Sequence, residues 1–222
     1  TGDGSAKIPI LFAGRKFIDT VLPTSIKELE EKIEKEGKPQ SFILKDAVVK
    51  MQANVEVKEV KAKNVVGYLD GAGDFAKETV VLGAHYDHLG RGENGTRAMF
   101  SNDIHYGADD NASGTTGLLE LARRYGSQKD RKGRRLVFIA FSGEEKGLLG
   151  SKHYAKNPYF PIKDTIAMLN MDMIGRVRED DKTKKELLEV GGVGSAKNFE
   201  TLLDDANKKF AFQLSKTKSG TG

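Results

Sequence analysis

The segment TVVLGAHYDH, residues 79–88, is the most informative for the architecture, because it joins a short apolar run to a group of polar side chains. Two similar apolar runs follow, LVFIAF at 136–141 and IAMLNMDMI at 166–174. Near-continuous apolar runs of this length are typical of strands buried on both faces, as in parallel sheets. Helical patterns at 114–125 and 148–156 separate the three runs. This alternation predicts a three-layer α/β/α sandwich around a mixed, mostly parallel central sheet.

The residues before the first run predict a helix and two further strands. Ser25 and Glu28 fit a capping box, which marks the start of a helix that Gly37 ends. Residues 49–57 alternate strictly between apolar and polar side chains, which predicts a half-buried strand near a sheet edge. Residues 64–69 predict a second strand. A last helix is expected near the C-terminal end, over 195–210.

Composition and charge exclude several classes of function. The chain has 222 residues and no cysteine, which excludes disulfides, thiol catalysis, Cys-ligated zinc and iron–sulfur clusters. No apolar run approaches the roughly 18 residues of a membrane span, so we expect no membrane partner. The net charge of +4 comes from interleaved acidic and basic residues, and the densest basic cluster, 129–135, contains Asp130 and no aromatic residue. We therefore expect no nucleic-acid partner.

Polar residues stand at the ends of the predicted strands and at the start of one predicted helix. The sequence contains no phosphate-binding loop, dinucleotide fingerprint, nucleophile elbow or HExxH motif. It does contain four short polar motifs: GAHYDH at 83–88, GADDNASG at 107–114, SGEE at 142–145 and NMDMIG at 170–175. Ligands of open α/β sheets bind beyond the carboxyl ends of the strands. These motifs are therefore the candidate functional site.

Each motif also has an ordinary structural explanation. His85 could be a hydrogen-bonded histidine, the polar residues 109–111 a helix cap, and Glu144 with Glu145 a solvated turn. Asp172 is harder to explain, because a carboxylate within an apolar strand costs several kcal/mol unless it is paired or metal-bound. An ordinary explanation would have to apply to all four motifs at the same time. We therefore favour a metal site.

The residue types indicate which metal and which chemistry. Histidine and carboxylate ligands without sulfur suit zinc, and less specifically manganese or cobalt. Of the adjacent Glu144 and Glu145, one can bind a metal ion while the other faces a substrate and moves protons. Asp87 lies two residues from His85 on the same strand face, where it can fix the imidazole tautomer.

The four motifs together resemble the cocatalytic zinc aminopeptidases of the aminopeptidase Y type, which are related to bacterial leucyl aminopeptidases and glutamate carboxypeptidase II. The resemblance covers about residues 46–222, and 25, 35 and 27 residues separate positions 85, 110, 145 and 172. It implies two zinc ions. His85 and Asp172 would hold one ion, Asp110 would bridge both, and Glu145 would hold the other.

The resemblance also implies an activity. Glu144 would be the general base and Asp87 would orient the histidine, in a hydrolysis of peptides that have a free N-terminus. A carboxypeptidase or a glutaminyl cyclase on the same scaffold remains an alternative. A non-catalytic binding module like the transferrin receptor ectodomain is disfavoured, because that class lacks working metal ligands and all the expected ones occur here.

The chain departs from the family pattern at one point. The family has a further metal-ligand histidine in a later Ser-Asp-His motif, but no histidine follows Asp172. Residues 219–222 resemble the stretch just before that motif. We therefore expect a truncated peptidase domain over 46–222, with an incomplete second metal site and little activity. Replacement of the missing ligand by His88 or His105 is less expected, because each stands in a different loop context.

The N-terminal segment and the location follow from the same resemblance. Residues 8–22 resemble the closing strand and helix of a protease-associated domain, so segment 1–45 would be the tail of such a domain plus a connecting helix. Relatives with this insert are mostly secreted or periplasmic. We therefore expect an extracellular or periplasmic protein.

Overall fold

The computed structural model describes residues 12–45, 48–50, 52, 59–91, 103–179 and 186–220. The chain divides into two compact units, Thr1–Val60 and Lys61–Gly222. The strand expected over 49–57 and the segment 8–11 lie largely or wholly outside the described residues. The assignment of residues 1–45 to a protease-associated domain stays a prediction.

Among its described residues, the first unit contains two helices, α1 (Arg15–Asp19) and α2 (Ile26–Glu36). The capping box that the sequence predicts is confirmed at α2. The Ser25 hydroxyl accepts a hydrogen bond from the Glu28 amide at 3.2 Å, and the Ser25 amide donates to Glu28 Oε2 at 3.3 Å. Gly37 ends the helix with φ +63°, a conformation that glycine adopts without steric cost.

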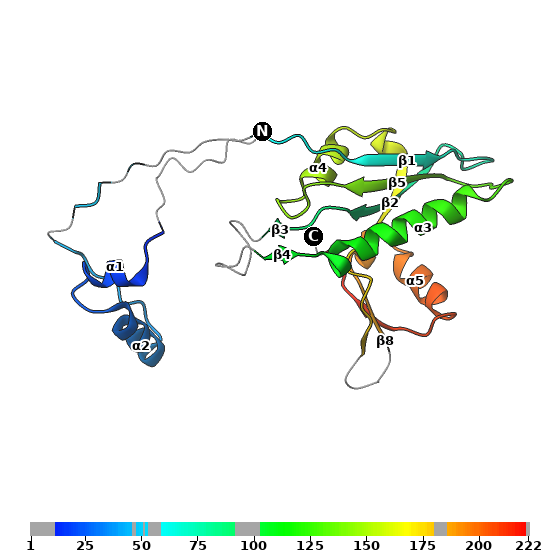
Figure 1. Ribbon diagram of the computed structural model, residues 1–222. Coiled ribbons are helices and arrows are strands. Elements are labelled where there is room, and N and C mark those ends of the chain that lie inside the picture. Colours follow the sequence, from blue (N-terminus) through cyan, green and yellow to red (C-terminus); the bar gives the residue numbers. More distant parts are fainter. Residues whose placement is uncertain are drawn as a thin grey trace. The chain divides into compact units, whose positions relative to one another are not determined.

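The second unit is built on a four-stranded sheet of order β1-β5-β2-β6 (Figure 1). Its strands are β1 (Val65–Leu69), β2 (Thr79–His85), β5 (Arg135–Phe141) and β6 (Thr165–Asn170). β2 pairs in parallel with both β5 and β6, while β1 pairs antiparallel with β5. The expected mixed, mostly parallel central sheet is confirmed.

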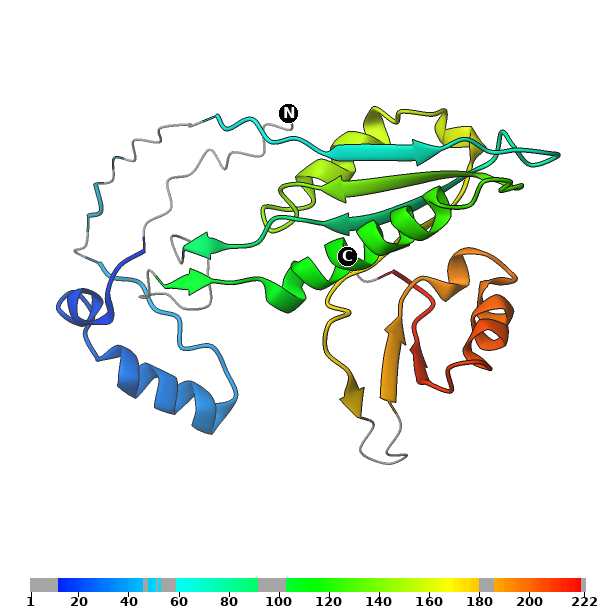
Figure 2. The ribbon, with the colours of Figure 1, turned by 45° about the vertical axis from the view of Figure 1, so that its right-hand side comes forward.

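Side chains of the central strands alternate between two faces, and a helix covers each face. Val81, Val137 and Ile139 pack with Tyr154 of α4 (Leu149–Lys156). Leu82, Ala84 and Phe138 pack on the other face with Leu118 of α3 (Gly114–Gly126). Figure 2 shows α3 lying along this second face. The period of two in each strand therefore produces the three layers.

The third apolar run differs from the prediction of a strand buried on both faces over 166–174. β6 ends at Asn170 and pairs with β2 on one side, and the described residues contain no neighbour on its other side. Ile166, Met168 and Leu169 are consequently exposed. Asp172 lies in the loop after the strand, with 43% of its side chain exposed. Asp172 is therefore not a carboxylate within a buried strand, and the sequence-based prediction that it is one was wrong.

The remaining elements lie beside this core. β3 (Gly90–Arg91) and β4 (Ile104–His105) form an antiparallel pair, and η2 (Ile162–Asp164) leads into β6. A second sheet has the order β7-β8-β9 and comprises β7 (Arg178–Glu179), β8 (Glu186–Val190) and β9 (Gln213–Lys216). The helix expected over 195–210 is shorter: the turn η3 (Val193–Ser195) precedes α5 (Phe199–Asn207).

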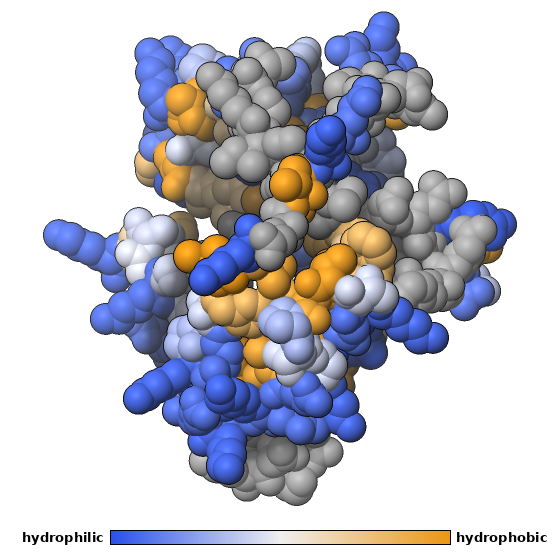
Figure 3. Space-filling view, turned by 90° about the vertical axis from the view of Figure 1, so that its left-hand side faces the viewer, coloured by the Kyte–Doolittle hydropathy of each residue, from blue (hydrophilic) through white to orange (hydrophobic). Residues whose placement is uncertain are grey.

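The surface carries both hydrophilic and hydrophobic side chains (Figure 3). Large apolar side chains such as Leu119 of α3 and Tyr106 after β4 are exposed. Among the helices that the structure describes, none combines the length and the apolar character needed to cross a membrane.

Candidate metal centre

The sheet brings the candidate residues together at one edge, because β2, β5 and β6 run in parallel and end on the same side. His85 is the last residue of β2, Glu144 and Glu145 follow β5, and Asp172 follows β6. Asp110 lies in η1 (Ala108–Ser113), the turn that leads into α3. Every candidate residue named from the sequence therefore lies at this edge of the sheet.

His85 is held in the orientation of a metal ligand. Its side chain is 2% exposed, and Nδ1 donates to the main-chain carbonyl of Asp87 at 3.0 Å. A neutral imidazole that donates from Nδ1 presents a lone pair at Nε2. Nε2 lies 3.2 Å from Asp110 Oδ1 and 3.5 Å from Asp172 Oδ1. These three ligand atoms lie within 4.8 Å of one another, which forms a first ligand group.

A second ligand group shares Asp110 with the first. It consists of His88, Asp110 and Glu145, whose ligand atoms also lie within 4.8 Å of one another. His88 Nδ1 is 2.7 Å from Glu145 Oε1 and 3.8 Å from Asp110 Oδ1. Sequence reasoning gave His88 little weight. Its position three residues after His85, in the loop that leaves the same strand, is the sequence feature from which it could have been identified.

The residues present fit zinc. Zinc–ligand distances of about 2.0–2.2 Å in a tetrahedron separate neighbouring ligand atoms by roughly 3.3 Å. The two separations from His85 Nε2, 3.2 and 3.5 Å, are close to that value. In the second group, the buried atoms His88 Nδ1 and Glu145 Oε1 have no hydrogen-bond partner among the described residues. Two unsatisfied buried atoms that face each other are what a bound cation would satisfy.

The carboxylates make this edge of the sheet attractive to cations. The pKa of Glu144 is raised by burial and by the nearby carboxylates of Glu145, Asp172 and Asp110, while His85 opposes the shift. Burial also raises the pKa of Asp172. Burial lowers the pKa of His85, but the Asp172 carboxylate, the hydrogen bond to the Asp87 carbonyl and the other carboxylates together outweigh it and leave the pKa raised. Burial is the largest cause of the raised pKa at Glu144 and Asp172, and repulsion among the carboxylates, which a metal ion would relieve, adds to it.

Asp87 makes two separate contacts. Its main-chain carbonyl holds the imidazole of His85, as described above, and its carboxylate Oδ1 accepts from the Glu144 amide at 3.3 Å. The same Oδ1 is 3.8 Å from His85 Nδ1, beyond hydrogen-bond distance. The side chain of Asp87 therefore positions the loop of Glu144, and its backbone orients His85.

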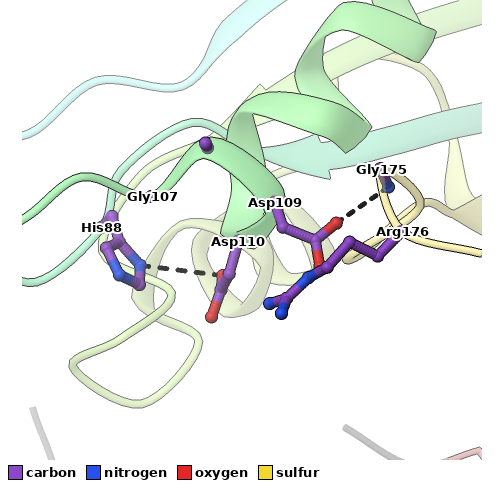
Figure 4. A pocket seen from close by; sticks show the side chains of 7 residues that line it. His88, Gly107, Asp109, Asp110, Gly175 and Arg176 are labelled. Atoms are coloured by element: carbon purple, nitrogen blue, oxygen red, sulfur yellow. Dashed lines mark hydrogen bonds and ion pairs between the residues drawn. The ribbon is translucent and has the colours of Figure 1, made fainter.

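A pocket of about 430 Å³ opens beside the second ligand group, with His88, Asp110 and Arg176 among its lining residues (Figure 4). Asp109 accepts from the Gly175 amide at 2.8 Å and from Arg176 Nε at 2.7 Å. The hydrogen bond from Arg176 lowers the pKa of Asp109. These contacts fix the loop after β6 against η1, so the pocket has a defined wall.

A histidine and carboxylate centre at the carboxyl edge of a mostly parallel sheet defines the class as an α/β protein with a candidate two-metal site. Residues 64–221 match the family model described as Peptidase family M28. Because the match spans most of the chain, the chain belongs to peptidase family M28.

Individual relatives agree with this family. A probable zinc metalloprotease of Pyrenophora tritici-repentis is 35% identical over 129 residues, 56% of this chain and 27% of that protein. Aminopeptidase YwaD of Bacillus subtilis is 33% identical over 132 residues, 59% of this chain and 25% of that protein. The aligned part of the chain thus corresponds to about a quarter of each of these relatives.

A solved structure shows the same fold. A Zn-dependent exopeptidase from Parabacteroides distasonis superposes with a TM-score of 0.54 at 21% sequence identity, over 72% of this chain and 56% of that one. At this identity the likeness concerns the fold alone.

Proposed function

We propose that this chain carries the catalytic centre of a zinc-dependent aminopeptidase, which removes residues from peptides with a free N-terminus. The observation that carries the proposal is the pair of ligand groups that share Asp110. His85 and Asp172 would hold one zinc ion, Asp110 would bridge both ions, and Glu145 would hold the other. Relatives named zinc metalloprotease and aminopeptidase support a zinc-dependent peptidase of this kind.

The proposed reaction is hydrolysis of a peptide bond, in which a water oxygen bonds to the carbonyl carbon and the bond from carbon to nitrogen breaks. Two zinc ions, when bound, lower the pKa of the attacking water and stabilise the developing negative charge on the carbonyl oxygen. Glu144 takes a proton from this water and passes it to the leaving amine. Its raised pKa suits a group that must both accept and release a proton.

The supporting residues of this chain have distinct roles in the proposal. The Asp87 carboxylate positions the loop of Glu144, and the Asp87 carbonyl leaves Nε2 of His85 free to bind a zinc ion, which His85 would hold with Asp172. The sequence-based expectations of weak activity and of an extracellular or periplasmic location stay predictions.

The test is a comparison of matched substrates with the zinc-loaded chain. We expect weak, zinc-dependent release of leucine from leucine p-nitroanilide and none from its N-acetylated form. Glu144→Gln should retain zinc and lower turnover by about 10²–10⁴-fold. Glu120→Gln, on the exposed surface of α3, is the matched control and should change neither. Preference for a blocked N-terminus, or cyclisation of an N-terminal glutamine, would favour the carboxypeptidase or cyclase alternative.

A further inference from the structure

We infer that His88 is a nitrogen ligand of the second metal ion, alongside Asp110 and Glu145. The inference rests on the metal centre of the proposed function and is independent of the peptidase activity. Its starting point is the second ligand group, in which a histidine from the loop after β2 faces a glutamate from the loop after β5.

The contact between His88 and Glu145 is not an ordinary hydrogen bond. The His88 side chain is 21% exposed and that of Glu145 is 17% exposed, yet the two facing atoms, Nδ1 and Oε1, are both buried. They are 2.7 Å apart, and neither has a hydrogen-bond partner among the described residues. A buried polar atom without a partner is costly. A cation bound to both the nitrogen and the oxygen satisfies the two atoms at once.

The surroundings of His88 fix its ring in this direction. Gly107 has φ +64°, and a Cβ atom there would lie 2.8 Å from Cβ and Cγ of His88. The absence of a side chain at Gly107 therefore makes room for the histidine. The ring of His105 lies on edge to that of His88, with 6.4 Å between centroids. Confinement by Gly107 and contact with His105 limit the rotamers of His88, which favours metal binding.

The ligand set indicates the class of metal ion and leaves a coordination position open for a water or a substrate. One imidazole and two carboxylates suit zinc, cobalt or manganese better than magnesium or calcium, which prefer oxygen ligands. Three protein ligands are the usual number at a catalytic zinc, where a further position stays open. His88 and Asp110 also line the pocket in Figure 4, so an ion held by them would border that space.

The first test counts metal ions. After dialysis against zinc, we expect about two ions per wild-type chain, the number of a cocatalytic site, and about one ion in His88→Ala. His153→Ala is the matched control, because His153 lies exposed on α4, and it should keep both ions. Two tightly bound ions in His88→Ala, or fewer than two in the wild-type chain, would overturn the inference.

The second test identifies the ligand directly and uses the absence of cysteine from the chain. His88→Cys places the only thiol at the site, and thiolates bind zinc and cobalt. We expect this variant to recover the second ion and, with Co²⁺, to gain a thiolate-to-cobalt charge-transfer band. His153→Cys should show no such band. The absence of the band from a folded, Co²⁺-loaded His88→Cys chain contradicts the inference. A wild-type chain that holds both ions but hydrolyses no peptide substrate would instead count against the proposed function.

Discussion

Asn111 donates from Nδ2 to the main-chain carbonyl of Met171, 3.0 Å away, and so joins the two loops that carry Asp110 and Asp172. Asn111 Oδ1 accepts from the Gly114 amide at 3.0 Å. Asn111 is only 1% exposed, so water competes little for these hydrogen bonds. The buried side-chain amide of Asn111 therefore holds the loops of two candidate metal ligands together without a bound metal ion.

Replacement of Asn111 should affect both stability and metal binding. Asn111→Ala removes the side-chain partner of the Met171 carbonyl and of the Met173 amide, which costs about 1–3 kcal/mol of unfolding free energy. We also expect weaker zinc binding, because Asp110 and Asp172 lose the link between their loops. Urea denaturation of the zinc-free chain and a zinc titration measure the two effects.

The control for this prediction is Asn157→Ala at the end of α4. Asn157 is exposed, and its side chain bonds to the His153 carbonyl within the same helix. It should lower stability much less and leave zinc binding unchanged. Equal effects of the two substitutions would show that Asn111 does not link the loops.

Two glycines of α3 should respond to alanine in opposite directions. A Cβ atom on Gly114 would clash with the Met171 carbonyl oxygen, whereas one on Gly126 would meet no described atom within 4 Å beyond its chain neighbours and the backbone of its own helix. Gly114→Ala should therefore destabilise the chain by about 1–3 kcal/mol, as overpacking does. Gly126→Ala should stabilise it by about 0.4–1 kcal/mol, because alanine loses less backbone entropy in a helix.

Thermal unfolding of the two variants beside the wild-type chain tests this pair. A Gly114→Ala chain as stable as wild type would mean that α3 can move away from the loop after β6.

Sequence patterns predicted the elements that depend on local chemistry. The capping box of Ser25 and Glu28, the strand over 79–84 and the helix over 114–125 follow from hydrogen-bonding side chains and hydrophobic period, which act over a few residues. The candidate ligands could be named because parallel strands bring their carboxyl ends to one edge.

Other features depend on contacts between distant residues and could not be read from the pattern. The apolar run over 166–174 looks like a fully buried strand, but burial depends on which neighbours pair with it, and β6 ends at Asn170. The approach of His88 to Glu145 depends on the paths of two loops, which no local period determines.

Asp87 should act on Glu144 through its side chain and on His85 through its backbone. Asp87→Ala removes the acceptor for the Glu144 amide but keeps the carbonyl that holds His85. We expect zinc content to stay unchanged while hydrolysis falls by up to about 100-fold, the effect of a displaced catalytic group. Asp87→Asn keeps an oxygen acceptor and should restore much of the activity. Loss of zinc from Asp87→Ala would instead assign the side chain to the orientation of His85.

The stability of α2 should depend on pH through Glu28. Hydrogen bonds from the Thr24 hydroxyl and then the Ser25 amide lower the pKa of Glu28 below its ordinary value of 4.5. A carboxyl whose pKa is lowered by folding stabilises the folded form above its unfolded pKa, and this contribution is lost as the pH falls through the folded pKa. The helix should therefore weaken on acidification below about pH 4.5. Amide exchange across residues 26–36 measures this loss.

Glu28→Gln separates the charge of this residue from its capping geometry. Glutamine can still accept from the Ser25 amide, so the helix should persist. The stability of the helix should no longer fall over the pH range in which the Glu28 carboxylate becomes protonated. Glu34→Gln, on the same helix, makes none of the capping contacts and should keep the wild-type pH dependence. If Glu28→Gln loses protection on acidification as the wild-type chain does, the pH dependence arises from another carboxylate of the unit, such as Glu30, whose pKa is lowered by Arg15.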